Sequence, residues 1–275
     1  EGDGPPFTQI LNGLSGLPNQ MAIGATWQPE QSRRIGQIAG RELSAIGVNM
    51  LLGPSLDVLE VPQPYNASDL GTRSFGGDPF WVGLMGQAYT AGVHEGAEGR
   101  LAVIAKHFPG YGSSDRPINV EVGSVRKSLE QLKQIELAPF FAVTGQAPNE
   151  LSIVDGLMSA HVRYQGFQGN IRATTAPVSF DPQALTTLME LPEFAEWRSN
   201  AGIIVSDELG VGAVQRFYDD TGQEFPHRLV AKDALLAGND LLYLSQFALD
   251  SAGDEAHIAN IKDTVTWFIE KYETD

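Results

Sequence analysis

The sequence predicts an α/β protein in which parallel strands are buried between helices. Short runs of consecutive apolar residues, such as 101–105, alternate with longer amphipathic segments, such as 29–46, along the chain. Strands that are apolar at consecutive positions are buried on both faces, which is typical of a parallel sheet covered by helices. The length of 275 residues suits one α/β barrel or two small domains.

The elements follow one another in a regular helix–strand order. The first helix begins with Pro29 in its first turn and ends just before Gly47, a start and a stop that both favour a helix. The predicted helices are 29–46, 79–97, 125–144, 182–191, 227–237 and 257–272. The predicted strands are 48–52, 101–105, 156–162, 202–207 and 239–244.

These units are fewer than the eight that a closed (β/α) barrel requires. An open doubly wound sheet is the alternative architecture. The turn after the first strand does not have the glycine-rich sequence that binds phosphate in many such sheets, which weighs against this alternative.

The charge balance restricts the partners. The chain carries 34 acidic and 18 basic residues, for a net charge of -16, so nucleic acid and anionic membranes would be repelled, whereas a neutral ligand such as a sugar would not. The sequence contains no cysteine, which excludes disulfides, thiolate catalysis and zinc–thiolate sites. It shows no run of about 18 apolar residues and no signal peptide at its start. The absence of cysteine fits a bacterial protein that is either cytoplasmic or secreted.

Polar side chains follow all five predicted strands. Because the carboxyl ends of parallel strands meet at one edge of a sheet or barrel, these groups are expected to converge on a single pocket. In chain order they are Asp57, Lys106 with His107, His161, Asp207 with Glu208, and Ser245.

Each of these residues also has a simpler structural interpretation. Asp57 could hold a loop turn or cap a helix, and His161 could be a hydrogen-bonded core histidine. Asp207 could be a nucleophile, a metal ligand or a helix cap, although Gly210 and Gly212 make an early helix start unfavourable. Burying Lys106 beside His107 costs desolvation energy unless a polar group occupies the space between them.

A metal site built from these groups is a further alternative. Its ligands would be Asp57, His107, His161 and Asp207, but the sequence contains none of the short histidine spacings that accompany such sites.

Several motifs, in this order, resemble glycoside hydrolase family 3 in its β-N-acetylglucosaminidase-like branch. They are LPNQMAIGAT at 17–26, GPSLDV at 53–58, RSFGGDP at 73–79, KHFPGYG at 106–112, SAHV at 159–162 and IIVSDELG at 203–210. The resemblance implies a (β/α)8 TIM-type barrel, with residues 1–275 forming a single catalytic barrel domain. It also implies that the first two strands and most of the third precede the sequence, whose opening EGDG is similar to the tail of the signature that ends the third strand. A missing N-terminal segment or an additional domain would then be a partner of this chain.

The resemblance also implies a function. The family hydrolyses terminal β-linked sugars with retention of configuration, and it normally needs no metal or organic cofactor. Its nucleophile matches Asp207, a carboxylate of the kind that a glycosyl-enzyme mechanism requires. Its binders of sugar hydroxyls match Asp57, Arg73, Lys106, His107 and His161.

The loop after KHFPGYG differs from the family pattern. In the glucosaminidase branch this loop carries an Asp-Ser-His triplet, and the histidine is the general acid/base. Here Asp115 is present but no histidine follows it, so Asp115 becomes the expected acid/base, with Glu121, Glu208 or a group from a missing segment as alternatives. The altered loop also leaves open a sugar-binding protein without turnover.

Overall fold

The computed structural model describes residues 13–61, 70–249 and 251–274. The EGDG opening lies outside the described residues. Among the described residues, no helix combines the length and the apolar character that a membrane crossing would require.

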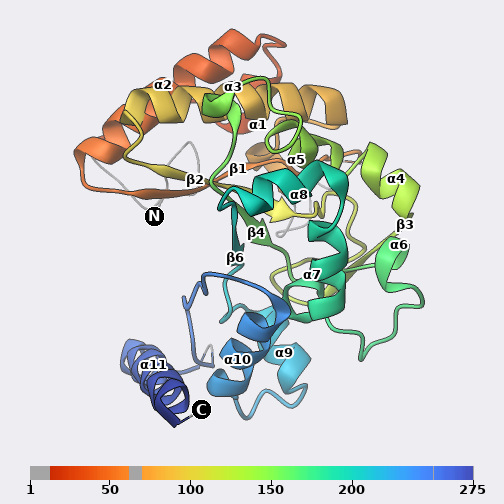
Figure 1. The fold of residues 1–275 in the computed structure, drawn as a ribbon. Helices are drawn as coiled ribbons and strands as arrows, with labels where there is room; N and C mark the ends of the chain where they lie inside the picture. Colours follow the sequence, from red (N-terminus) through yellow and green to blue (C-terminus); the bar gives the residue numbers. More distant parts are fainter. Residues whose placement is uncertain (1–12, 62–69, 250, 275) are drawn as a thin grey trace.

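The centre of the fold is a parallel sheet with the strand order β1-β2-β4-β6 (Figure 1). Leu51 of β1 pairs with Val103 of β2, and Leu157 of β4 pairs with Ile204 of β6. A second, two-stranded parallel sheet joins β3 to β5. The strands are β1 (Met50–Ser55), β2 (Ala102–Phe108), β3 (Gly123–Ser128), β4 (Gly156–Ser159), β5 (Val162–Tyr164) and β6 (Ile203–Ser206).

Helices pack around this sheet, with α2 and α3 side by side at the top of the view and α9, α10 and α11 at the bottom (Figure 1). The first group is α1 (Gln20–Gly24), α2 (Pro29–Ala45), η1 (Gly71–Arg73), α3 (Pro79–Ala97), α4 (Leu129–Gln134), α5 (Ala138–Ala142) and η2 (Glu150–Ser152). The second group is α6 (Gln165–Gln168), η3 (Val178–Phe180), α7 (Pro182–Met189), α8 (Pro192–Ser199), α9 (Gly212–Tyr218), α10 (His227–Ala237) and α11 (Asp254–Thr274).

Each central strand contributes one side chain to a buried cluster. Leu52, Ile104, Met158 and Val205 come from β1, β2, β4 and β6 and pack against one another. Side chains from neighbouring strands that pack in this way form the layered filling of a barrel interior. The consecutive burial expected for parallel strands is confirmed, since almost every residue of these strands is buried.

Helix starts follow the local sequence signals. Asp78 accepts a hydrogen bond from the backbone nitrogen of Trp81, and Pro79 occupies the first turn of α3. Because Asp78 and Pro79 belong to the RSFGGDP motif, this cap fixes the point where the loop after β1 turns into α3.

Three predicted elements differ from the structure. The expected helix 125–144 begins only at Leu129, because Val125 pairs with Tyr164 in the β3–β5 sheet and is fully buried. The expected strand 239–244 is reduced to an isolated bridge between Leu241 and Val205. The expected strand 156–162 divides into β4 and β5, and His161 lies at the break between them.

Candidate functional site

A buried carboxylate organises the carboxyl end of β1 and β2. Asp57 has no exposed surface. Its Oδ2 accepts hydrogen bonds from Ser55 Oγ and His107 Nδ1, each at 2.8 Å, and its Oδ1 accepts one from the Tyr111 backbone nitrogen at 2.8 Å. The carboxylate is therefore used by donors of the protein itself, and its position suits holding His107 better than contacting a ligand.

His107 is fixed from two sides. Since a carboxylate accepts only, the hydrogen of Nδ1 points to Asp57 and leaves Nε2 as the outward nitrogen. The Tyr111 ring packs against the imidazole with 4.4 Å between ring centroids, and its hydroxyl lies 3.4 Å from Nε2. Burial, together with the charges of Asp57 and Asp207, raises the pKa of the Tyr111 hydroxyl well above 10. Tyr111 is therefore a neutral hydrogen-bond donor at this site.

Asp207 follows β6 and is partly exposed. Burial works to raise the pKa of its carboxyl, but the electrostatic influence of His107, His161 and Lys106, with a hydrogen bond from the Glu208 backbone nitrogen, outweighs it and holds that pKa below the usual 3.8. Asp207 is therefore ionised at neutral pH.

His161 lines the same cavity as Asp207. It is buried, and its Nε2 donates to the Glu208 carbonyl oxygen at 3.0 Å while its Nδ1 accepts from Ser179 Oγ at 2.7 Å. Burial lowers the pKa of this imidazole despite the charge of Asp207. The neutral ring thus has a defined tautomer, and the Phe180 ring stacks on it at 5.4 Å.

The remaining expected binding residues lie close to this group. Lys106 is 6% exposed and close enough to influence the pKa of Asp207. Arg73, at the end of η1, is partly exposed and acts electrostatically on the hydroxyl of Tyr111. The structure thus brings Asp57, Lys106, His107, His161 and Asp207 together, with Arg73 near Tyr111.

Asp115, the expected acid/base residue, makes its contacts with residues of β3. Oδ1 of Asp115 accepts a hydrogen bond from the Ser124 backbone nitrogen at 2.7 Å, and Oδ2 lies 3.6 Å from Arg126 Nε. Of the named alternatives, Glu121 pairs with Arg116 on the protein surface, and Glu208 lines a cavity together with Asp207. In this conformation the Asp115 carboxylate is directed toward β3.

The segment after Asp115 covers Asp207. Ile118 and Asn119 line a cavity of about 30 Å³ together with His161, Asp207 and Glu208. That volume holds a water molecule or two and is too small for a sugar ring. The segment is attached to α9, because the Asn119 carbonyl oxygen accepts from the Ala213 nitrogen at 3.1 Å.

A comparison with known protein families matches residues 7–266 to the model described as glycosyl hydrolase family 3 N terminal domain. The chain belongs to glycoside hydrolase family 3. Arg73 and the strand-end residues Lys106, His107, His161 and Asp207 all lie inside the matched range.

The curated relatives of this family 3 domain include bacterial enzymes named β-hexosaminidase. The one from Hydrogenovibrio crunogenus is 26% identical over 272 residues, which cover 96% of this chain and 65% of the relative. The one from Pseudomonas aeruginosa is 27% identical over 210 residues, which cover 76% of this chain and 56% of the relative. The chain therefore spans between half and two thirds of the length of these relatives.

Solved structures confirm the barrel expectation for the family 3 domain. A glycoside hydrolase family 3 β-N-acetylglucosaminidase from Paenibacillus sp. superposes with a TM-score of 0.74 at 25% identity, covering 97% of this chain and 48% of that one. The M. tuberculosis LpqI structure superposes with a TM-score of 0.71 at 20% identity, covering 100% of this chain and 71% of that one. The expectation of a TIM-type α/β fold was correct.

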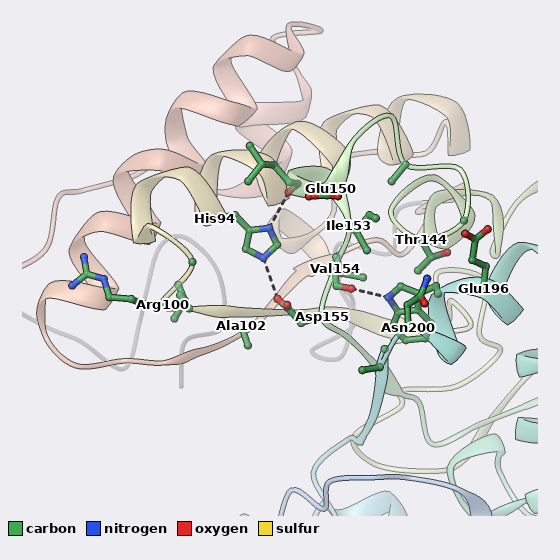
Figure 2. Close-up of a pocket in the computed structure, with 18 of the residues that line it drawn as sticks. His94, Arg100, Ala102, Thr144, Glu150, Ile153, Val154, Asp155, Glu196 and Asn200 are labelled. Carbon is green, nitrogen blue, oxygen red and sulfur yellow. Dashed lines mark hydrogen bonds and ion pairs between the residues drawn. The ribbon is translucent and has the colours of Figure 1, made fainter.

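A larger cavity, of about 840 Å³, lies at the opposite end of the central sheet. It includes Asn49, Ala102, Asp155 and Gly202, which come just before or at the start of the four central strands. Figure 2 shows His94 and Asp155 pointing toward each other there, with Glu196 and Asn200 on the far wall. Catalytic residues of barrels lie at the carboxyl ends of strands, so this cavity is not the candidate active site.

His94 and Asp155 have a structural task in that cavity. His94 Nε2 lies 3.0 Å from Asp155 Oδ2, and Nδ1 lies 2.9 Å from the Leu151 carbonyl oxygen. Both of these partners only accept, so both ring nitrogens donate and His94 is an imidazolium. Burial opposes that charge, but the hydrogen bonds to Asp155 and to the Leu151 carbonyl oxygen, together with the charge of Asp155, outweigh it and raise the pKa of His94 above 6.5.

Two residues of the site were not predicted from the sequence. Tyr111 was visible within KHFPGYG, where its place next to the turn was the available signal. Ser179 contacts His161 from 18 positions further along the chain, and no sequence motif marks it. Among the described residues, no group of three or more His, Cys, Asp or Glu side chains is arranged to hold a metal ion.

Proposed function

We propose that residues 1–275 form a catalytic barrel that hydrolyses terminal β-linked N-acetylglucosamine or glucose residues with retention of configuration. Family membership supports the reaction class, and the names of the curated relatives support the hexosaminide. The observation that carries the proposal is Asp207, an ionised carboxylate at a strand end beside two histidines and a lysine.

The chemistry assigns Asp207 the role of nucleophile. One carboxylate oxygen attacks the anomeric carbon while the bond to the leaving oxygen breaks, and a proton delivered to that oxygen completes the leaving group. Water then attacks the anomeric carbon of the glycosyl–Asp207 ester and gives one proton back to the group that protonated the leaving oxygen, which releases the sugar and restores the carboxylate. Lys106 donates to sugar oxygens, Nε2 of His107 can accept from a sugar hydroxyl, Arg73 and His161 are further binding candidates, and Asp57 orients His107.

The proton donor in this proposal is Asp115, chosen for its place in the loop. Its carboxylate is bonded to Ser124 and lies near Arg126, so it acts only after the loop rearranges around a bound sugar. Apo geometry often differs from the productive arrangement of a general acid.

The second candidate function is a sugar-binding protein without turnover. The observation that favours it is the loop 113–121, which has no histidine and whose Asp115 carboxylate is bonded to Ser124. An ionised carboxylate placed beside Lys106 and two histidines counts against it, because a binding protein has no need of a nucleophile.

A mechanism-based probe separates these two functions. The protein is incubated with activated 2-fluoro glycosides of the gluco and N-acetylglucosamino series, and the adduct is located by peptide mass spectrometry. A covalent adduct on Asp207, absent from Asp207→Asn, is the expected result. Sugar binding without any adduct from either donor would favour the binding protein.

A further inference from the structure

A buried charge pair lies beneath the root of the loop that covers Asp207. Glu136 sits between α4 and α5 and has no exposed surface. Its Oε1 accepts hydrogen bonds from Ser113 Oγ at 2.6 Å and from Lys127 Nζ at 2.5 Å. Lys127 comes from β3 and also pairs with Glu60, which follows β1. The chain Ser113–Glu136–Lys127–Glu60 thus connects the ends of three strands.

The charges in this chain depend on one another. Glu136 Oε2 is buried and makes no hydrogen bond to any described residue, so the carboxylate relies on Lys127 for its compensation. Burial acts to lower the pKa of Lys127, but its hydrogen bonds to Glu136 and Glu60 outweigh this and raise that pKa. Since a lysine and two carboxylates are held in fixed contact, Glu136 gives Ser113 a charged acceptor in a defined position.

The backbone at the loop root leaves no space for another arrangement. A Cβ atom at Gly110 would lie 3.0 Å from both Cβ and the carbonyl oxygen of Glu136, and Gly110 has a φ of +109°. A Cβ atom at Gly112 would lie 2.0 Å from the Val58 carbonyl oxygen. The Tyr164 hydroxyl donates to the Gly110 carbonyl oxygen at 2.8 Å. The glycines of KHFPGYG therefore let the chain pass directly over Glu136.

Ser113 is the point where this rigid root becomes the covering segment. Two residues later, Asp115 is bonded to Ser124, and further on the Asn119 and Val120 carbonyl oxygens accept from Ala213 and Arg216 on α9. The hydroxyl of Ser113 is thus a side-chain link between the covering segment and the buried charges.

We propose that Glu136 is a positioning residue: through Ser113 it sets where the loop 113–121 lies over Asp207 and so where its proton donor can act. This inference rests on the proposed glycosidase function for its catalytic part, and on geometry alone for the placement of the loop.

The most direct test is the variant Ser113→Ala, which removes the hydrogen bond from Ser113 to Glu136 and leaves the buried pair of Glu136 and Lys127 intact. Ser113→Thr keeps the hydroxyl and serves as the conservative variant. Ser44→Ala, which deletes a surface hydroxyl bonded to the Arg41 carbonyl oxygen on α2, is the matched control. Glu136→Gln is a second test, but because it leaves Lys127 without its buried partner its thermal stability must be measured alongside.

Two measurements compare these variants with the wild-type protein. Amide hydrogen exchange of peptides covering 111–121 reports the placement of the loop without any substrate, and we expect exchange to be several-fold faster in Ser113→Ala, because opening costs less free energy. Steady-state kinetics with phenyl and 2,4-dinitrophenyl glycosides report the acid step. We expect kcat on the phenyl glycoside to fall on the order of tenfold, with a smaller fall on the dinitrophenyl glycoside. Ser113→Thr should retain most of both properties.

Failure of this inference can be distinguished from failure of the proposed function. If the wild-type protein turns over no aryl glycoside, the proposed function fails, and hydrogen exchange alone then decides whether Ser113 and Glu136 hold the loop. Unchanged exchange in Ser113→Ala would overturn the inference whatever the kinetics. Faster exchange with equal losses on both glycosides, or with no loss, would overturn its catalytic part.

Discussion

His107 Nδ1 lies 2.8 Å from Oδ2 of Asp57, a carboxylate that has no exposed surface and also accepts from Ser55 and from the Tyr111 backbone nitrogen. One buried group therefore determines both the tautomer of His107 and the path of the chain that follows it.

Replacing Asp57 by asparagine should impair catalysis more than folding. The amide keeps the shape and can still accept from the Tyr111 nitrogen, but it cannot accept from Ser55 and His107 as a carboxylate does. We expect kcat/KM to fall by about 10²-fold or more. Asp57→Ala should lower the free energy of unfolding by about 3–5 kcal/mol, since it leaves several buried donors unpaired. An Asn variant with wild-type kinetics would contradict the orienting role.

Asp207→Asn should abolish turnover and leave sugar binding measurable by calorimetry. The pKa of Asp207 is held below 3.8, so the nucleophile remains ionised down to acidic pH, and the acid limb of kcat/KM that it produces should lie below about pH 4. The same shift means that Asp207 contributes stability above its unfolded pKa, a contribution lost as pH falls through the folded value. Retained activity in the Asn variant would remove Asp207 as the nucleophile.

Asp115→Ala should slow hydrolysis of poor leaving groups more than that of good ones. A general acid contributes about 10²–10⁴-fold where the leaving group needs a proton, and little for 2,4-dinitrophenyl glycosides. Arg126→Ala is the matched control, because it removes the partner 3.6 Å from Asp115 Oδ2 without removing the carboxylate. Equal losses on both substrates would show that Asp115 acts only by holding Ser124.

His94→Ala should destabilise the protein in a pH-dependent way. The folded pKa of His94 is raised, so its contribution is complete below the unfolded value of about 6.5 and is lost as pH rises through the folded value. The pKa of Asp155 is lowered, because its hydrogen bonds to His94 and the Val103 backbone nitrogen, together with the charge of His94, outweigh burial. Its contribution is therefore lost as pH falls through the folded value. The difference in Tm between wild type and His94→Ala should be largest between about pH 4 and 6.5. A difference that grows from pH 6 to pH 9 would contradict the imidazolium assignment.

Periodicity predicted most of the fold, and it failed where tertiary pairing decided the structure. The helix 79–97 was predicted with the bounds that α3 has, because Pro79 and the apolar spacing are local signals. Lys127 was expected in a helix, yet Ser128 and Gln131 form a capping box that starts α4 at Leu129. That box was readable in the sequence. The pairing of Val125 with Tyr164 was not, since it joins residues far apart in the chain.

The site was predictable as a set of residues and not as a set of contacts. Strand ends marked Lys106, His107, His161 and Asp207, and the structure places these groups around one cavity or close to it. Asp57 was expected to bind sugar hydroxyls, but its complete burial and its hydrogen bond to His107 appear only in three dimensions. Ser179 has no sequence signal at all, because it reaches His161 through the turn of η3.

The candidate active site and the His94–Asp155 pair lie at opposite ends of the four central parallel strands. Asp155 immediately precedes β4 and His161 follows it, and a strand of that length separates them by more than about 10 Å. Substitutions that are this far apart and share no partner contribute nearly additively to stability. The amino-terminal end of the sheet is therefore a place where the protein can be stabilised, or its pH tolerance shifted, without altering the reactivity of Asp207.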